Sequence, residues 1–262
     1  MDKLGMKDFF GMPWLPINGS AHGDALDSIN IWVQWLMLIL MVGWGIFFIY
    51  TLIRFRQSRN PKADYVGVTS HNSTYLEIAV ALVEVVLLVG FSIPLWAAYT
   101  EEFPDEAESL VIRVVAEQFA WNFHYPGPDG VFGESDPELV DSEDNPLGLD
   151  RDEDEDAYDD IVTQVLHLPV NKPVITHVTS KDVIHNFGIP VMRVKLDAIP
   201  GSSIPVSFTP ILEGKFLIAC SQLCGLGHSA MQGFIEVHSQ EGYDEWMAEE
   251  VAELELDEEE DE

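Results

Sequence analysis

Two long apolar stretches dominate the hydrophobic and polar pattern in the first part of the chain. The stretch at 31–53 has no charged residue, and the stretch at 78–99 has one, Glu84. At ~1.5 Å per helical residue the first stretch spans roughly 35 Å, enough to cross the hydrocarbon core of a bilayer. The pattern therefore predicts two transmembrane helices.

The segment between these stretches, at 54–62, is basic, and its four cationic residues are Arg54, Arg56, Arg59 and Lys62. Basic loops are retained on the cytoplasmic side of membranes, so both termini are expected outside the cell. The apolar clusters within 1–30 are too short and too interrupted for a secretory signal peptide. We therefore expect a multi-pass cell-membrane protein with an external N-terminal segment at 1–30 and a helical hairpin at 31–99.

After residue 109 the pattern changes to short runs rich in β-branched and aromatic residues, separated by Pro and Gly. We expect strands within six segments: 109–125, 161–168, 174–179, 204–209, 215–219 and 233–237. Many short strands of this kind are typical of an antiparallel sandwich or barrel. The expected fold class is thus a membrane-anchored all-β protein, with its external domain at 109–240.

Two acidic segments interrupt or follow this domain. The insertion at 134–160 is expected to be a solvated loop, because its composition cannot form a core. It lacks the spaced ligands and central glycine of a calcium loop. The segment at 241–262 is expected to begin as a helix around Trp246 and to continue as an acidic tail.

The formal net charge of the 262 residues is −32. A chain this acidic repels nucleic acid, which is excluded as a partner. The acidity fits either a salt-adapted, halophilic surface or a docking face for a basic protein. The first interpretation is favoured, because acidic residues are spread along the whole chain and lysine is scarce.

The only two cysteines, Cys220 and Cys224, lie four positions apart and are followed by His228 and Met231. A disulfide between them is possible outside the cytoplasm. Two thiolates, an imidazole and a thioether instead form a soft ligand set that favours copper. A mononuclear blue-copper site uses one cysteine, whereas two thiolates can bridge two copper ions.

A second histidine ligand is expected at His185. Asp182 and Asn186 are placed to orient its ring through hydrogen bonds. Three apolar neighbours are expected to keep water away from it: Val183, Ile184 and Phe187.

Three motifs together resemble cytochrome c oxidase subunit II: KDVIHNF at 181–187, VKLDAIPG at 194–201, and the loop at 220–231. They occur in the order of that family, after the same two-helix anchor, and the resemblance covers about 30–130 and 160–240. It implies a cupredoxin-like Greek-key β-sandwich or barrel that carries a binuclear copper centre of the CuA type.

The resemblance also implies the ligands. One copper ion would take His185, Cys220, Cys224 and Met231. The other would take His228, the same two cysteines and the backbone carbonyl of Gln222. The family often has Glu at the position of Gln222, where it binds magnesium at the interface with subunit I. Glutamine is a weaker magnesium ligand, so the resemblance leaves this ion undecided.

Four further residues match functional positions of the family, with departures. In the family's aromatic stretch, Phe119 stands where a tryptophan often receives the electron, and Trp121 matches the second tryptophan. Glu77 matches a carboxylate at a proton-uptake path on the cytoplasmic side. The Trp-Thr-x-x-Pro that usually follows is absent. Glu84 stands where the proline would be, and is expected either to contact a helix of subunit I or to belong to a proton path.

The implied function is that of the electron-transfer subunit of a haem-copper terminal oxidase. Electrons would come singly from an external soluble donor, either cytochrome c or a small blue-copper protein, and pass to haem in subunit I. Oxygen reduction and proton translocation would occur there. The chain has no C-x-x-C-H haem motif, so the donor is expected to be a separate protein. The alternatives are the CuA-bearing subunit of a membrane nitric oxide reductase and a membrane-anchored copper chaperone or sensor.

Overall fold

The computed structural model describes residues 15–62, 65–67, 69–142, 144–151 and 153–261, with side chains described up to residue 254. The rest of the expected N-terminal segment, 1–14, lies outside the described residues. The chain divides into two compact units. One holds residues 25–101, and the other combines the segment before residue 25 with residues 102–262.

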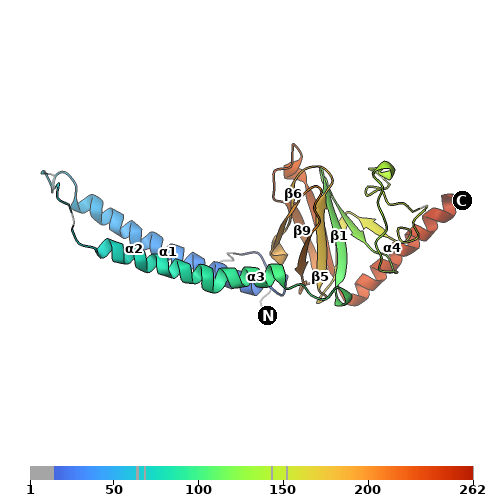
Figure 1. The fold of residues 1–262 in the computed structure, drawn as a ribbon, viewed down its shortest axis with the longest axis horizontal. Helices are drawn as coiled ribbons and strands as arrows, with labels where there is room; N and C mark the ends of the chain where they lie inside the picture. The colour runs from blue at the N-terminus through green and yellow to red at the C-terminus, as the bar shows by residue number, and fades with distance from the viewer. Residues whose placement is uncertain (1–14, 63–64, 68, 143, 152, 262) are drawn as a thin grey trace. The chain divides into compact units, whose positions relative to one another are not determined.

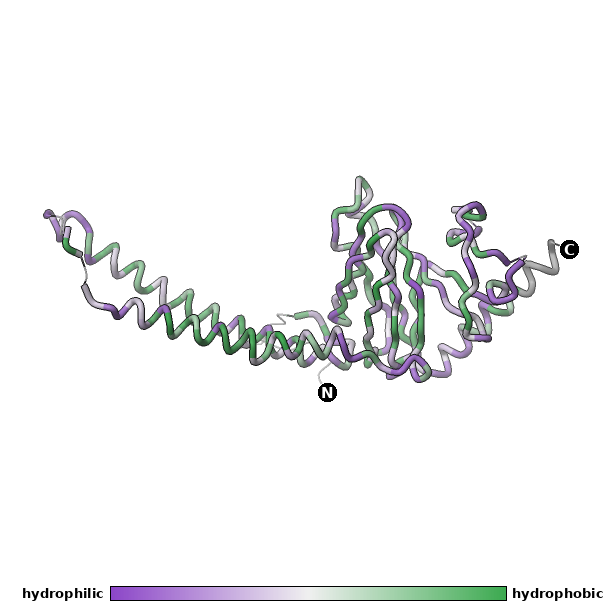
Figure 2. The backbone as a smooth tube through the Cα atoms, in the orientation of Figure 1, coloured by the Kyte–Doolittle hydropathy of each residue, from purple (hydrophilic) through white to green (hydrophobic). Residues whose placement is uncertain are grey.

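The first unit is the helical hairpin (Figures 1 and 2). Helix α1 covers Gly23–Arg54, and α2 covers Asn72–Leu87. A π-helical turn, η1 at Leu88–Ser92, leads from α2 into α3 at Ile93–Glu101. Both α1 and the continuous helix over Asn72–Glu101 are long and apolar enough to cross a membrane.

These helices extend beyond the predicted spans of 31–53 and 78–99, and the second one is not regular. The Ile93 N–H bonds the carbonyl of Leu88, five residues back, directly before Pro94. Proline has no N–H to donate and its ring crowds the preceding turn, so a widened turn is a common way to accommodate it. Pro94 is evident in the sequence, but the π-helical turn before it was not predicted.

The second unit is a sandwich of two five-stranded sheets (Figure 1). The first sheet has the order β3-β2-β1-β5-β8, with strands at Ile161–Thr163, Ala120–Tyr125, Leu110–Glu117, Val174–Ser180 and Ile204–Phe208. The second has the order β4-β10-β9-β6-β7, with strands at Val165–Pro169, Gln232–His238, Gly214–Cys220, His185–Ile189 and Val194–Ala198. The predicted fold class, two apolar helices followed by a cupredoxin-like β-sandwich, is confirmed.

Alternation of side chains builds the core of this sandwich. In β1, Ile112, Val114 and Ala116 are fully buried, while the residues between them are only partly covered. Phe123 of β2 and Phe187 of β6 meet across the core, with ring centroids 6.4 Å apart. Because strand side chains alternate between faces, this pattern also directs every second residue outward.

Two expectations about the strands were wrong. Strands β6 and β7 lie outside the predicted strand segments, and the sheets are mixed rather than antiparallel. The parallel pairs are β1 with β5 and β10 with β4. Strand β6 contains Asn186 and Gly188, which are poor strand formers, so its pairing with β7 and β9 decides its conformation.

The acidic insertion at 134–160 is not simply a solvated loop. Leu147, Leu149 and Ala157 are buried and form a small apolar cluster against Val115 and Val162. The carboxylate of Asp160, fully buried, lies 2.6 Å from His124 Nε2 and accepts a hydrogen bond from the Gly133 N–H. These contacts tie the loop to the sandwich.

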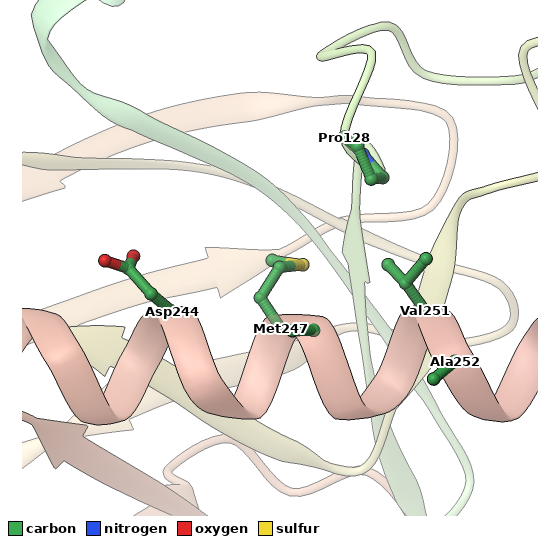
Figure 3. Close-up of a pocket in the computed structure, with 6 residues that line it drawn as sticks. Pro128, Asp244, Met247, Val251 and Ala252 are labelled. Carbon is green, nitrogen blue, oxygen red and sulfur yellow. The ribbon is translucent and has the colours of Figure 1, made fainter.

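The C-terminal segment forms one helix, α4 at Gln240–Asp261. Its first turns are anchored by Tyr243 and Trp246, both nearly buried. Farther along, Met247 and Val251 point toward Pro128, where they border a shallow apolar groove (Figure 3). The helix therefore packs on the sandwich through its apolar residues despite its acidic composition.

The segment before α1 also belongs to the sandwich. The Gly19 N–H bonds the Val191 carbonyl at 2.8 Å, and the Ile211 N–H bonds the Gly19 carbonyl at 2.7 Å. Ser20 is fully buried, and its hydroxyl donates to the Met192 carbonyl at 2.7 Å. The chain thus contributes to this domain on both sides of the hairpin.

Candidate metal centre

The Cys220–Met231 loop connects two adjacent antiparallel strands. Cys220 is the last residue of β9, and Met231 directly precedes β10. Gly225 has a φ of 139°, a conformation that side chains disfavour, and a short helical turn begins at His228. The strands and this turn bring the two ends of the loop back to one place.

Sulfur and nitrogen atoms converge inside the loop. The two cysteine sulfurs are 3.8 Å apart, and Cys224 Sγ lies 3.8 Å from Met231 Sδ and 3.6 Å from His228 Nδ1. Both cysteines are free thiols and buried, so the alternative of a disulfide is not what the structure contains. The backbone carbonyl of Gln222 lies 3.1 Å from Cys220 Sγ, on the same cluster.

His185 completes the cluster from the neighbouring strand. It begins β6, whose Phe187 pairs with Cys220 of β9. His185 Nδ1 is 3.1 Å from Met231 Sδ and 3.9 Å from Cys220 Sγ. All six predicted ligand positions are therefore brought together, and the thiol, imidazole and thioether donors fit copper.

Asp182 sets the orientation of His185. Its Oδ1 lies 2.8 Å from His185 Nε2, so the proton resides on Nε2 and Nδ1 faces the sulfur atoms. Burial raises the pKa of this carboxyl, but hydrogen bonds from His185, from the Val183 N–H and from the Gln118 N–H outweigh it, and the pKa is lowered. Asp182 thus stays ionised beside the ligand.

Burial, followed by the hydrogen bond and charge of Cys220, raises the pKa of Cys224 to about 11. Without a metal this thiol is protonated at neutral pH. A metal ion that binds here must displace the proton, so its affinity must rise with pH.

Gln118 is a residue of the site that the sequence did not single out. Its side-chain amide donates to the Cys224 carbonyl at 2.5 Å, and its backbone N–H donates to Asp182 Oδ2 at 2.7 Å. It therefore links the Cys220–Met231 loop to the residue that orients His185. Its place next to Phe119 in the aromatic stretch was the available signal.

The two aromatic residues of that stretch lie at different depths. Phe119 is partly exposed, and its ring packs so closely over Gly227 that an added Cβ there would lie 2.5 Å from it. Trp121 is 1% exposed, and its ring centroid is 6.3 Å from that of His185. A role for either in electron transfer stays a prediction.

His185 itself is fully buried, but two of the three apolar neighbours expected to shield it, Val183 and Ile184, are not. Both are exposed, because the turn before β6 directs them outward, and Phe187 alone of the three is buried. Two leucines of the Cys220–Met231 loop are even more exposed, Leu223 at 80% and Leu226 at 104%. The segments that hold the buried cluster thus also carry exposed apolar side chains.

The remaining predicted residues belong to the helical unit. Glu77 and Glu84 both lie on α2 with exposed side chains. Their proposed proton role stays a prediction. A second donor group that the sequence did not indicate lies in the sandwich, and consists of His167, Glu236 and His238.

Comparisons with known proteins agree with this geometry. Residues 110–238 match the family model described as cytochrome C oxidase subunit II, periplasmic domain. The alternative cytochrome c oxidase subunit 2 of Bradyrhizobium diazoefficiens is 31% identical over 236 residues, covering 89% of this chain and 82% of that protein. Cytochrome c oxidase subunit 2 of Cereibacter sphaeroides is 32% identical over 256 residues, covering 87% and 79%.

Among solved structures, the periplasmic domain of cytochrome oxidase subunit II of Bradyrhizobium japonicum is 28% identical, with a TM-score of 0.43, and covers 58% of this chain and 99% of that one. The assignment rests on the sequence matches, which span both the helical anchor and the sandwich. This chain belongs to the cytochrome c oxidase subunit II family.

Proposed function

We propose that this chain is the electron-transfer subunit of a haem-copper terminal oxidase. The single observation that carries the proposal is the convergence of Cys220, Cys224, His185, His228 and Met231 on one buried point. A mononuclear site does not require the second thiolate, which supports a binuclear centre. When bound there, two copper ions that share one electron supply one-electron transfer with little change in geometry.

The residues around the cluster have separate parts in this function. Cys220 and Cys224 would bridge the two ions, and His185 with Met231 would complete one of them. His228 and the Gln222 carbonyl would complete the other. Asp182 and Gln118 hold this set in place, and a rigid ligand set reduces the rearrangement that accompanies electron transfer.

The complex and its orientation are part of the proposal. The membrane-spanning helices anchor the chain. By the positive-inside rule, Arg54, Arg56 and Arg59 favour a cytoplasmic position for the loop that carries them, and the sandwich would then lie outside. Electrons would pass to haem in subunit I, which reduces oxygen and moves protons. Glu77 and Glu84 would face this partner, since carboxylates within a bilayer require a polar or protein environment.

A small blue-copper protein is the proposed electron donor. Five exposed apolar residues lie on or next to the segments that hold the cluster: Phe119, Val183, Ile184, Leu223 and Leu226. In strong salt, charge attraction to a basic cytochrome c is screened, whereas apolar contact is not. An apolar docking face therefore suits an acidic, salt-adapted protein.

The central test is the metal content and spectrum of the full chain, purified from membranes in detergent with copper supplied. We expect two copper ions per chain, a purple colour, and an electron paramagnetic resonance signal from one electron shared by both ions. A single blue copper, or oxidation of Cys220 and Cys224 to a disulfide, would contradict the proposal. Co-purification with a haem subunit that reduces oxygen rather than nitric oxide separates the oxidase from a nitric oxide reductase.

The donor surface has its own test. Replacing Leu226 by Ser is expected to slow electron transfer from the donor by about 10–100-fold, because a buried leucine contributes ~1.5–3 kcal/mol at a contact. Stopped-flow reduction of the copper centre measures the rate. The matched control is Leu139→Ser, an exposed leucine of the acidic insertion. Equal rates for both variants would rule out docking at this face.

A further inference from the structure

Three metal-binding side chains gather on the outer face of the second sheet, away from the copper loop. His167 lies on β4, and Glu236 and His238 lie on β10, where Glu236 pairs with His167 in register. His167 Nδ1 is 2.9 Å from His238 Nε2, and one ligand atom of each residue lies within 4.8 Å of the others. All three side chains are half-buried, so an ion from solution can reach them.

The positions of these side chains are fixed before any ion binds. The His167 ring stacks on Trp246 with centroids 4.2 Å apart and planes 3° from parallel. The backbone of His167 is held on both sides by the Tyr125 hydroxyl, at 2.7 Å and 3.0 Å. Because ligands on paired strands lose little further freedom, such a group is preorganised for binding.

The protonation state also suits a metal ion. Burial, and next the neighbouring His238, lower the pKa of His167 to about 4, so its ring is neutral at neutral pH. The hydrogen bond from Lys215, 2.7 Å from Glu236 Oε1, is the largest of the effects that lower the pKa of that carboxyl. Metal ions bind deprotonated ligands, and both groups are already in that form.

We propose that His167, His238 and Glu236 form a second metal site that takes a divalent transition-metal ion, Zn²⁺ in particular. Two imidazoles and a carboxylate are a ligand set that zinc accepts, with water in the fourth position. The site is separate from the copper loop. It lies at the opposite end of β10 from Met231, roughly 20 Å away at ~3.3 Å per residue.

Lys215 gives the proposal a specific signature. Its ammonium group holds Glu236 and places a positive charge beside the ion. Without the charge of Lys215, the carboxylate of Glu236 should bind the metal ion more tightly. We therefore expect Lys215→Gln to bind zinc roughly 3–10-fold more tightly, in line with one charge pair about 4 Å apart at the dielectric of bulk water.

The test uses the full chain in detergent, with its copper loop filled before zinc is added. Equilibrium dialysis against Zn²⁺ in about molar salt, which screens loose binding by the many carboxylates, is followed by elemental analysis. We expect one zinc ion per chain, with copper content and visible spectrum unchanged. His167→Gln and His238→Gln should each weaken zinc binding by at least ~10–100-fold. Loss of an outer-sphere partner already costs that much at metal sites, and these two residues are proposed as direct ligands.

His177→Gln is the matched control, because His177 is a half-buried strand histidine on the other sheet. It should bind zinc like the unmodified chain. If His167→Gln disturbs the stacking on Trp246 and fails to fold, His238→Gln and Lys215→Gln decide the question. Zinc binding that is absent, or that is equal in the unmodified chain and in His238→Gln, would overturn the proposal and leave a hydrogen-bonded histidine pair.

Discussion

Asp182 is not a predicted metal ligand, but it fixes the tautomer and the orientation of His185, which is one. It accepts hydrogen bonds from His185 Nε2, from the Gln118 N–H and from the Val183 N–H. The first bond fixes the tautomer, and the other two fix the carboxylate itself. His185 therefore presents Nδ1 to the sulfur atoms without having to reorganise.

Replacing Asp182 by Asn should lower copper affinity about 10–100-fold, the usual cost of removing an outer-sphere partner of a ligating histidine. Competition with a copper chelator measures the affinity. Asp136→Asn, at the N-terminus of a short helical turn in the acidic insertion, is the control. Equal affinities in the two variants would mean that His185 is oriented by its own strand rather than by Asp182.

Tyr243 provides a test at the residue scale that is independent of metal. Its hydroxyl is buried without a hydrogen-bond partner among the described residues, and burial, then Asp244, raise its pKa well above 10. Tyr243→Phe should therefore raise the free energy of unfolding by about 1 kcal/mol, because an unsatisfied buried hydroxyl is removed.

The same substitution should change the response to alkaline pH. A group whose folded pKa is raised contributes stability below its unfolded pKa, near 10, and this contribution is lost as the pH rises beyond it. The unmodified chain should thus lose more stability than Tyr243→Phe between about pH 8 and pH 11, as measured by denaturant unfolding. Tyr65→Phe, at a fully exposed tyrosine, should leave the pH response unchanged.

The sequence indicated the donor cluster, whose copper binding stays a prediction, because all predicted ligands except His185 lie in one short loop of unusual chemistry. It did not predict Gln118, whose amide reaches Cys224 across 106 positions, nor the pairing of His167 with His238 across 71. Such contacts depend on strand order, which local patterns do not contain. The exposure of Val183 and Ile184 was not predicted for a related reason, since it depends on the turn before β6.

At the scale of elements, apolar length and β-branched runs were sufficient for the two membrane helices and most of the strands. Strand β6 was not evident, because His185, Asn186 and Gly188 have little strand preference and β9 and β7 impose the conformation. For the acidic insertion, the prediction of a fully solvated loop was wrong. Its composition indicates solvent exposure, yet Leu149 and Ala157 anchor it.

The docking of this insertion can be tested at Gly133. A Cβ at Gly133 would lie 2.3 Å from Ala157 Cα, and backbone atoms cannot move aside easily. Gly133→Ala should destabilise the domain by about 1–3 kcal/mol, in the range typical of overpacking, and increase proteolysis within 134–160. Copper binding should be retained.

Gly242→Ala is the control for this change, because a Cβ there meets only ordinary contacts in the first turns of α4. It should be neutral or stabilising by up to ~1 kcal/mol, since alanine favours helices over glycine. If Gly133→Ala is as stable as Gly242→Ala, the insertion does not pack on the sandwich as described.

At the scale of the whole molecule, the net charge of −32 means that folding gathers like charges into a small volume. Salt screens this repulsion, so the thermal unfolding midpoint should rise from low salt to molar NaCl near pH 7. Circular dichroism measures the midpoint. Near pH 4.2, the isoelectric point, the same salt series should have little effect, and an equal rise at both values would contradict the charge explanation.

The segment before α1 has a consequence for the order of events during synthesis. Residues 16–21 leave the ribosome before either membrane helix, whereas their partners at 191–193 and 209–211 are made long after both. The sandwich therefore cannot complete its fold, including its contacts with residues 16–21, until the hairpin has been translated. A water-soluble fragment that begins after the hairpin would lack Ser20 and its neighbours. It should regain their contacts when a separate peptide of residues 15–24 is added.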